Sequence, residues 1–146
     1  MCFCLACGYA PVRGKPTPGL RVAAVKNDSA QAEAGGFLAA EFRSELAGRG
    51  QLEGEASSAP ELQVELFALS SLPTAAGAEG AAAFRLVAQV RVRAGDYVDV
   101  VGGSEDYLAG IDVLGTEANR RAALRRLARS IAKEAVERYD VADRLR

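Results

Sequence analysis

Apolar and polar residues alternate along two stretches in the middle of the chain, and this two-residue period predicts β-strands with one buried face. In the first stretch, Leu62, Val64, Leu66 and Ala68 fall on one side, and Gln63, Glu65 and Phe67 fall on the other. In the second, Phe84, Leu86, Ala88, Val90 and Val92 share one side, opposite Arg85, Val87, Gln89, Arg91 and Arg93. We interpret residues 73–80, which are rich in Pro, Ala and Gly, as the connection between these two strands.

Two further strands are expected. The Ala94-Gly95-Asp96 segment provides a tight turn, and residues 97–101 return as a strand, so that three strands form an antiparallel meander. The Gly102-Gly103 pair that follows predicts a bulge or a corner. Near the beginning of the chain, residues 20–25 predict a short apolar strand, which ends at the turn-forming Asn27-Asp28-Ser29.

Two other segments have the period of an amphipathic helix. Residues 37–47 carry Leu38, Phe42 and Leu46 at four-residue spacing, and Gly48-Arg49-Gly50 ends this helix. Thr116 is expected to cap the last helix, which we expect to end near Asp140. The apolar stripe of the last helix consists of Leu124, Leu127, Ala128, Ile131, Ala135 and Tyr139.

The resulting order of elements is β-α-β-β-β-α. Two amphipathic helices require an apolar sheet face to cover, which predicts an α+β fold. We expect a two-layer sandwich in which a mainly antiparallel four-stranded sheet carries both helices on one face. The length of 146 residues suits one domain, which we assign to residues 20–146, after a signal and tether in residues 1–19.

The composition argues against catalysis. The chain has no histidine, the side chain that most often acts as a general base or a metal ligand, and its net charge is -1. Glu105 and Asp106 are adjacent, so on an extended chain they point to opposite faces and cannot share a substrate. Gly102-Gly103-Ser104 lacks the Lys that a phosphate-binding loop requires. We therefore expect no enzyme, no metal site and no cofactor.

The cysteines all lie at the N-terminal end, at Cys2, Cys4 and Cys7, so they cannot form a disulfide framework across the domain. Leu5-Ala6-Cys7 has the small-residue junction of a bacterial lipoprotein signal, and we predict that the Cys7 thiol carries the lipid. Cys4 stands where such signals usually have Leu, and only six residues precede Cys7, fewer than a signal needs. We expect a start codon further upstream or a shortened chain; the alternative is an N-terminal tail with unremarkable cysteines.

The proline- and glycine-rich residues 8–19 then predict an extended tether. With Ala6-Cys7-Gly8-Tyr9 ahead of this order of elements, the chain resembles the lipopolysaccharide-assembly lipoprotein family, LptE. Ser104-Glu105-Asp106-Tyr107-Leu108 is similar to the end of the family's paired middle strands. Asp112-Val113-Leu114-Gly115-Thr116-Glu117-Ala118-Asn119-Arg120 is similar to the beginning of its last helix.

The resemblance implies an outer-membrane lipoprotein, anchored on the periplasmic side, that plugs the β-barrel translocon for lipopolysaccharide and assists its assembly. A guest in a wide, water-filled barrel needs a polar exterior. Two rows of polar side chains offer one. The first row is Arg85, Gln89, Arg91 and Arg93, and the second is Arg121, Arg125, Arg129 and Lys133.

Arg91 and Arg93 are candidates to bind lipopolysaccharide phosphate, because the guanidinium fork suits phosphate oxygens. The alternative is a solvated face. The family's basic lipid contacts are expected near the hairpin tip and before the last helix, yet residues 73–83 and 108–118 contain no Lys or Arg.

Two other functions remain open. A periplasmic lipoprotein adaptor for a cell-wall synthase or a secretion-channel subunit would have a similar domain. A nucleic-acid adaptor would use the basic last helix, but the near-neutral net charge and the lipoprotein signal argue against it.

Overall fold

The computed structural model describes residues 18–77 and 80–145. It confirms the α+β fold and the β-α-β-β-β-α order, with the first strand divided into two short pieces. The elements, in chain order, are β1 (Arg21–Val22), β2 (Lys26–Asn27), α1 (Ala32–Gly48), β3 (Glu61–Gly77), β4 (Gly80–Ala94), β5 (Tyr97–Leu108) and α2 (Val113–Arg144). No helix among the described residues has the length and apolar character needed to cross a membrane.

The sheet has five strands and is mixed, where we expected four mainly antiparallel ones. β3 and β4 pair antiparallel, and β4 and β5 do the same, which confirms the meander. β1 and β2 both pair with β3 in the parallel direction, at Arg21 with Glu61 and at Lys26 with Glu65. The parallel edge follows from α1, since a helix between two strands returns the chain to the same end of the sheet.

The segment expected to connect β3 and β4 is mostly strand, so that prediction was wrong. β3 continues through Pro73 to Gly77, and β4 begins at Gly80, which makes a long hairpin. Beyond Leu66, β3 has a neighbour on one side only. A proline is tolerated there, because it does not interrupt a ladder on the free side.

A β-bulge lies between Leu66 and Ala68, where the pairing of β3 with β4 shifts by one residue. Strict alternation placed Ala68 on the buried face, and this was wrong: Ala68 is exposed, and Leu69 packs against the core instead. The bulge was expected at Gly102-Gly103, but β5 pairs with β4 in regular register at both glycines. The extra residue in β3 therefore moves the later side chains of that strand to the opposite faces.

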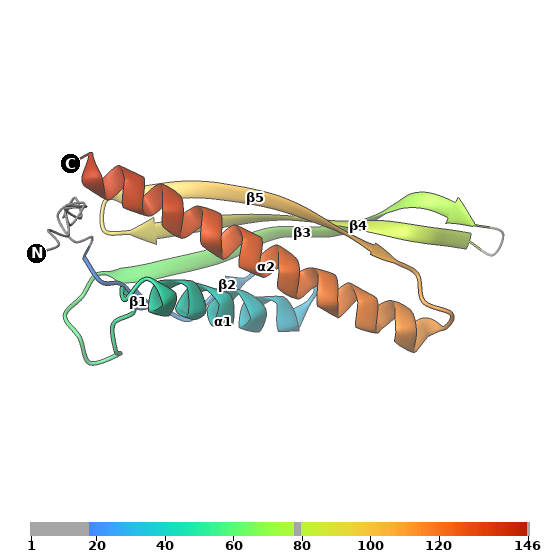
Figure 1. Ribbon diagram of the computed structural model, residues 1–146, viewed down its shortest axis with the longest axis horizontal. Coiled ribbons are helices and arrows are strands. Elements are labelled where there is room, and N and C mark those ends of the chain that lie inside the picture. Colours follow the sequence, from blue (N-terminus) through green and yellow to red (C-terminus); the bar gives the residue numbers. More distant parts are fainter. Residues whose placement is uncertain (1–17, 78–79, 146) are drawn as a thin grey trace, which may run out of the picture.

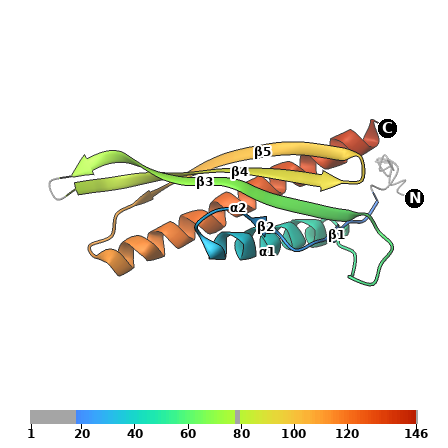
Figure 2. The ribbon, with the colours of Figure 1, turned by 180° about the vertical axis from the view of Figure 1, so that it is seen from behind.

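Both helices cover the same face of the sheet, and α1 lies beside α2 (Figures 1 and 2). The expected stripe of α2 is buried against the sheet along its whole length. The core combines Leu38, Phe42 and Leu46 of α1, Leu62, Val64, Leu66, Leu86, Ala88, Val90, Val92 and Val101 of the sheet, and Leu124, Leu127, Ala128, Ile131, Ala135 and Tyr139 of α2. The two-layer sandwich is thereby confirmed.

The helix ends differ from expectation. α1 begins at Ala32, five residues earlier than the apolar spacing indicated, and it ends at Gly48 as expected. α2 is capped by Asp112, whose side chain accepts a hydrogen bond from the Gly115 amide, and not by Thr116. The helix also continues to Arg144, beyond the expected end near Asp140.

Candidate functional site

The face of the sheet that no helix covers is the first candidate site. Register places Glu65, Arg91 and Val100 in one row across three strands, and Gln63, Arg93 and Val98 in the next row. Val98 and Val100 are half-exposed. We call this surface the open face; it also includes Phe67, Arg85, Val87 and Gln89. The sequence signal for Val98 and Val100 was present, since both sides of the strand in residues 97–101 carry apolar residues, but we had not used it.

A groove crosses the open face at its parallel edge. Its volume is about 690 Å³, and Arg91 and Arg93 line it together, as the strand alternation predicted. The other lining residues are Ala23, Ala24, Lys26, Glu61, Gln63, Val64 and Glu65. The chain before α1 thus brings Lys26 to the two arginines of β4.

Most of the charged side chains that line this groove form ion pairs. Glu65 accepts hydrogen bonds from Lys26 Nζ at 2.6 Å and from Arg91 Nη1 at 2.5 Å. The contact with Lys26, followed by that with Arg91, holds the pKa of Glu65 below its ordinary value, and the same carboxylate raises the pKa of Lys26. The Arg91 guanidinium also lies 5.0 Å from the centre of the Phe67 ring. Arg91 is therefore held in place by the protein itself.

Arg93 differs from Arg91, because it forms no ion pair or hydrogen bond with any residue that the structure describes. Its exposed guanidinium is free to bind an anion from solution. Two predicted phosphate ligands thus lie on one surface, but only Arg93 is without a carboxylate. A phosphate bound here would meet one free guanidinium and would have to compete with Glu65 for the second.

The basic row on α2 contacts α1. Arg121 pairs with Glu33 at 2.8 Å, Arg129 pairs with Glu41 at 3.2 Å, and Arg125 lies 4.8 Å from the Phe37 ring centre. In each contact the partners are 88 positions apart, as in the Arg49–Glu137 pair. A constant offset means that α1 and α2 run parallel. Three of the four basic residues of this row therefore join the helices, while Lys133 is exposed.

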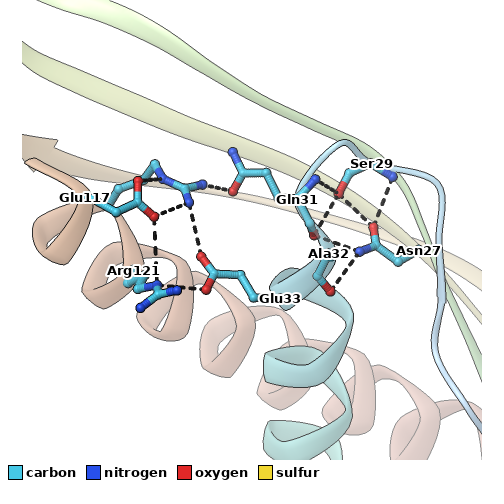
Figure 3. Close-up of polar contacts among 8 residues, drawn as sticks. Asn27, Ser29, Gln31, Ala32, Glu33, Glu117 and Arg121 are labelled. Atoms are coloured by element: carbon cyan, nitrogen blue, oxygen red, sulfur yellow. Dashed lines mark hydrogen bonds and ion pairs between the residues drawn. The ribbon is translucent and has the colours of Figure 1, made fainter. Parts of the chain in front are cut away.

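A second polar cluster joins the beginnings of the two helices (Figure 3). Arg120 donates to both oxygens of Glu117, at 2.5 and 2.8 Å, and to Glu33 at 3.1 Å. It also donates to Gln31. We had not singled out this cluster. Only its local part, Glu117 three residues before Arg120, could have been found in the sequence.

No protein-family model matches the chain, and no curated protein matches it. Solved structures do. Rare lipoprotein B from Shewanella oneidensis aligns with a TM-score of 0.58 and 14% identity, over 84% of this chain and 96% of that one. The chain therefore shares its fold with a bacterial lipoprotein. Protein XCC0632 from Xanthomonas campestris aligns with a TM-score of 0.56 and 12% identity, over 87% of this chain and 86% of that one. At such low identity, these matches establish the fold only.

The similarity in fold concerns the described domain and says nothing about the N-terminal segment that precedes it. The predicted lipid attachment site, Cys7, lies outside the described residues. Within the domain, Glu105 and Asp106 point to opposite faces as expected, because Glu105 pairs with Arg126 of α2 and Asp106 pairs with Arg85 on the open face. These two carboxylates therefore do not form a joint acidic site.

Proposed function

We propose that the chain is a lipid-anchored lipoprotein of the outer membrane, on its periplasmic side, that plugs the β-barrel translocon for lipopolysaccharide and assists its assembly. The observation that carries this proposal is the fold shared with rare lipoprotein B over 84% of the chain. The Leu5-Ala6-Cys7 junction supports it, because the thiol of such a cysteine receives the lipid.

The charge distribution of the domain fits a guest inside a wide barrel. Lumens of such barrels are polar, and barrels of about 22 strands hold a plug. The open face presents Arg85, Gln89 and Arg93 beside Val98 and Val100, a mixed surface of the kind found at protein interfaces. The apolar core lies on the helix side of the sheet, and this face carries no helix.

We propose a non-catalytic role. The chain has no histidine, and the groove on the open face holds a carboxylate that is already neutralised by Lys26 and Arg91. If lipopolysaccharide phosphate is bound directly, Arg93 is its first ligand and Arg91 its second. The Glu65 contact makes Arg91 the weaker of the two.

Affinity purification from outer membranes tests the proposal. We expect a β-barrel protein to co-purify with the wild-type chain and to be lost with Val100→Asp, because the new charge lies on the open face. Ala40→Asp, on the exposed side of α1, is the matched control and retains the barrel. Thermal melts of both variants exclude unfolding. Recovery of a cell-wall synthase or a secretion-channel subunit in place of a barrel would overturn the proposal and favour the adaptor.

A further inference from the structure

The edge of the sheet formed by β1, β2 and β3 is protected against pairing with another chain. β1 and β2 consist of two residues each, and Lys26 lies in β2. Beyond Leu66, the free side of β3 carries Pro73, and its register shifts at several positions. Short strands, lysine, proline and bulges are the features with which natural proteins prevent edge-to-edge pairing.

β5 forms the opposite edge and has none of these features. Among the described strands it pairs with β4 alone, in regular register over its 12 residues. It contains no proline and no lysine, and its three acidic side chains each pair with an arginine. β5 lies along the border of the sheet (Figures 1 and 2). Its outer side is therefore open to a further strand.

Alternate residues of β5 direct their backbone N–H and C=O groups away from β4. Ala94 and Tyr97 close the two-residue turn Gly95-Asp96 as a hydrogen-bonded pair, so the odd-numbered residues of β5 face β4. The Ala109 amide, just beyond the strand, agrees with this pattern, because it donates to the Ala82 carbonyl at 3.0 Å. The even-numbered residues therefore face outwards.

Side chains cover two of the outward groups and leave the middle of the edge open. Val100 N–H donates at 2.8 Å to the carboxylate of the residue before it, and the Asp106 carbonyl accepts from Arg126 Nη2 at 3.4 Å. Gly102 and Ser104 lie between these positions and are exposed. No described residue bonds to their outward backbone groups. Two amides and two carbonyls thus face outwards at the spacing of a β-ladder.

The position of α2 determines which kind of strand fits beside β5. α2 lies directly against β5, since a Cβ at Gly103 would lie 2.9 Å from Leu127 Cδ1. If two copies paired antiparallel through β5, their α2 helices would lie about 4.8 Å apart, one strand spacing. Packed helices need about 8–10 Å. A single extended segment that carries no helix avoids this conflict.

The side chains next to the open edge indicate what such a segment carries. Val98 and Val100 are 54% and 45% exposed on the open face, and both are outward residues of β5. Apolar side chains of a neighbouring strand would cover them, because cross-strand pairs stabilise a sheet. Backbone hydrogen bonds would supply the affinity, as in other cases of strand addition.

We propose that an extended segment of the partner protein pairs with the free edge of β5 as an additional strand, with apolar side chains beside Val98 and Val100. This inference rests on the proposed function for the existence of a membrane partner, but it does not require that partner to be a β-barrel.

Proline at position 104 tests the added strand. Ser104→Pro removes one outward N–H and leaves the hydrogen bonds to β4, because an edge strand tolerates proline where its N–H faces solvent. We expect this variant to bind the purified partner roughly tenfold more weakly or worse. Ser104→Ala keeps the N–H, and as the matched control it is expected to bind as the wild type does. Thermal melts of both variants check the fold.

Hydrogen exchange of the wild-type chain provides a second measurement, which decides alone if Ser104→Pro melts below the wild type. In the isolated chain, the amides of Gly102 and Ser104 are expected to exchange fast, and that of Gly103, which faces β4, slowly. In the complex with the purified partner, the two outward amides are expected to exchange roughly tenfold more slowly or less.

The outcomes separate this inference from the proposed function. Equal affinities of folded Ser104→Pro and Ser104→Ala, or outward amides that exchange equally fast in the complex, would overturn the inference, while a co-purifying barrel would leave the proposed function intact. Protection by a partner other than a barrel would overturn the proposed function and support the added strand. A wild-type dimer in sedimentation equilibrium that Ser104→Pro abolishes would assign the edge to a second copy. Absence of any co-purifying protein would remove both proposals.

Discussion

Gly103 allows α2 to approach the sheet. A Cβ atom at this position would lie 2.9 Å from Leu127 Cδ1 and 3.2 Å from Ile131 Cγ1. We expect Gly103→Ala to lower the free energy of unfolding by about 1 kcal/mol, because the methyl group must displace packed core side chains. Chemical denaturation with an unchanged slope measures this loss.

The neighbouring glycine is the matched control. A Cβ at Gly102 would lie 3.6 Å from the Ala88 carbonyl oxygen, an ordinary contact, on the open face. Gly102→Ala is therefore expected to be neutral or slightly stabilising, since it reduces the freedom of the unfolded chain. Equal losses in both variants would mean that strand glycines are required for another reason than the approach of α2.

Tyr97 makes the free energy of unfolding depend on pH in the alkaline range. Its hydroxyl donates to Asp99 Oδ2 at 3.2 Å, and burial, followed by the charge of Asp99, raises its pKa from 10.0 to about 12. Between these values the unfolded chain releases the proton and the folded chain keeps it, so the free energy of unfolding falls as pH rises. We expect Tyr97→Phe to lose less stability than the wild type between pH 10 and about 12. Parallel pH profiles of the melting temperature would contradict this assignment.

At the scale of elements, the α1–α2 contact depends unequally on its ion pairs. Arg49 donates to Asp140 at 2.8 Å, and the Asp140 side chain is 10% exposed, with Gln51 as its other donor. Arg49→Met leaves this carboxylate without its cation. Breaking a buried pair usually costs about 3–5 kcal/mol, and because Gln51 remains we expect a loss of about 2 kcal/mol.

Arg129→Met is the matched control, because Arg129 also joins α2 to α1, through Glu41, but is 72% exposed. Exposed ion pairs contribute less than about 1 kcal/mol, so this variant should unfold close to the wild type. Denaturation curves of both variants give the comparison. A larger loss in Arg129→Met would mean that burial does not determine the strength of these contacts.

The elements in which apolar residues recur at a regular spacing could be predicted from the sequence. The stripe of α2 and the alternation of β4 depend only on the residues themselves, and the placement of Arg91 and Arg93 on one face followed from that alternation. The bulge after Leu66 was not predictable, because no glycine or proline marks it. The strand path through Pro73 depends on the absence of a second neighbour, which a linear pattern does not reveal.

The candidate site was predictable to the same limited extent. The strand pattern placed two arginines together, but Glu65, which neutralises Arg91, and Lys26, which pairs with the same carboxylate, come from other strands. Likewise, the α2 arginines were expected on a free polar surface, and their partners on α1 lie 88 positions away. A row of charged residues on one element predicts a polar surface. Which oppositely charged residue pairs with each of them depends on the tertiary fold.

At the scale of the whole molecule, the two layers divide the surface by role. The helices bury the core face of the sheet and neutralise one another's charges across the α1–α2 contact. The open face carries no helix and contributes no side chain to the apolar core. The open face is thus available to a partner along the sheet.

The proposed connection of this domain to a membrane depends on a single thiol, that of Cys7, outside the described residues. Expressed behind a bacterial lipoprotein signal in place of residues 1–6, the wild-type chain is expected in the membrane fraction, because the two or three acyl chains of a mature lipoprotein hold firmly. Cys7→Ser removes the acceptor for the lipid and is expected to release the protein with an unchanged melting temperature, since the core lies in residues 20–139. Fractionation and labelling with radioactive palmitate measure both effects. If Cys7→Ser is retained on membranes as fully as the wild type, the anchor is not a lipid on this cysteine.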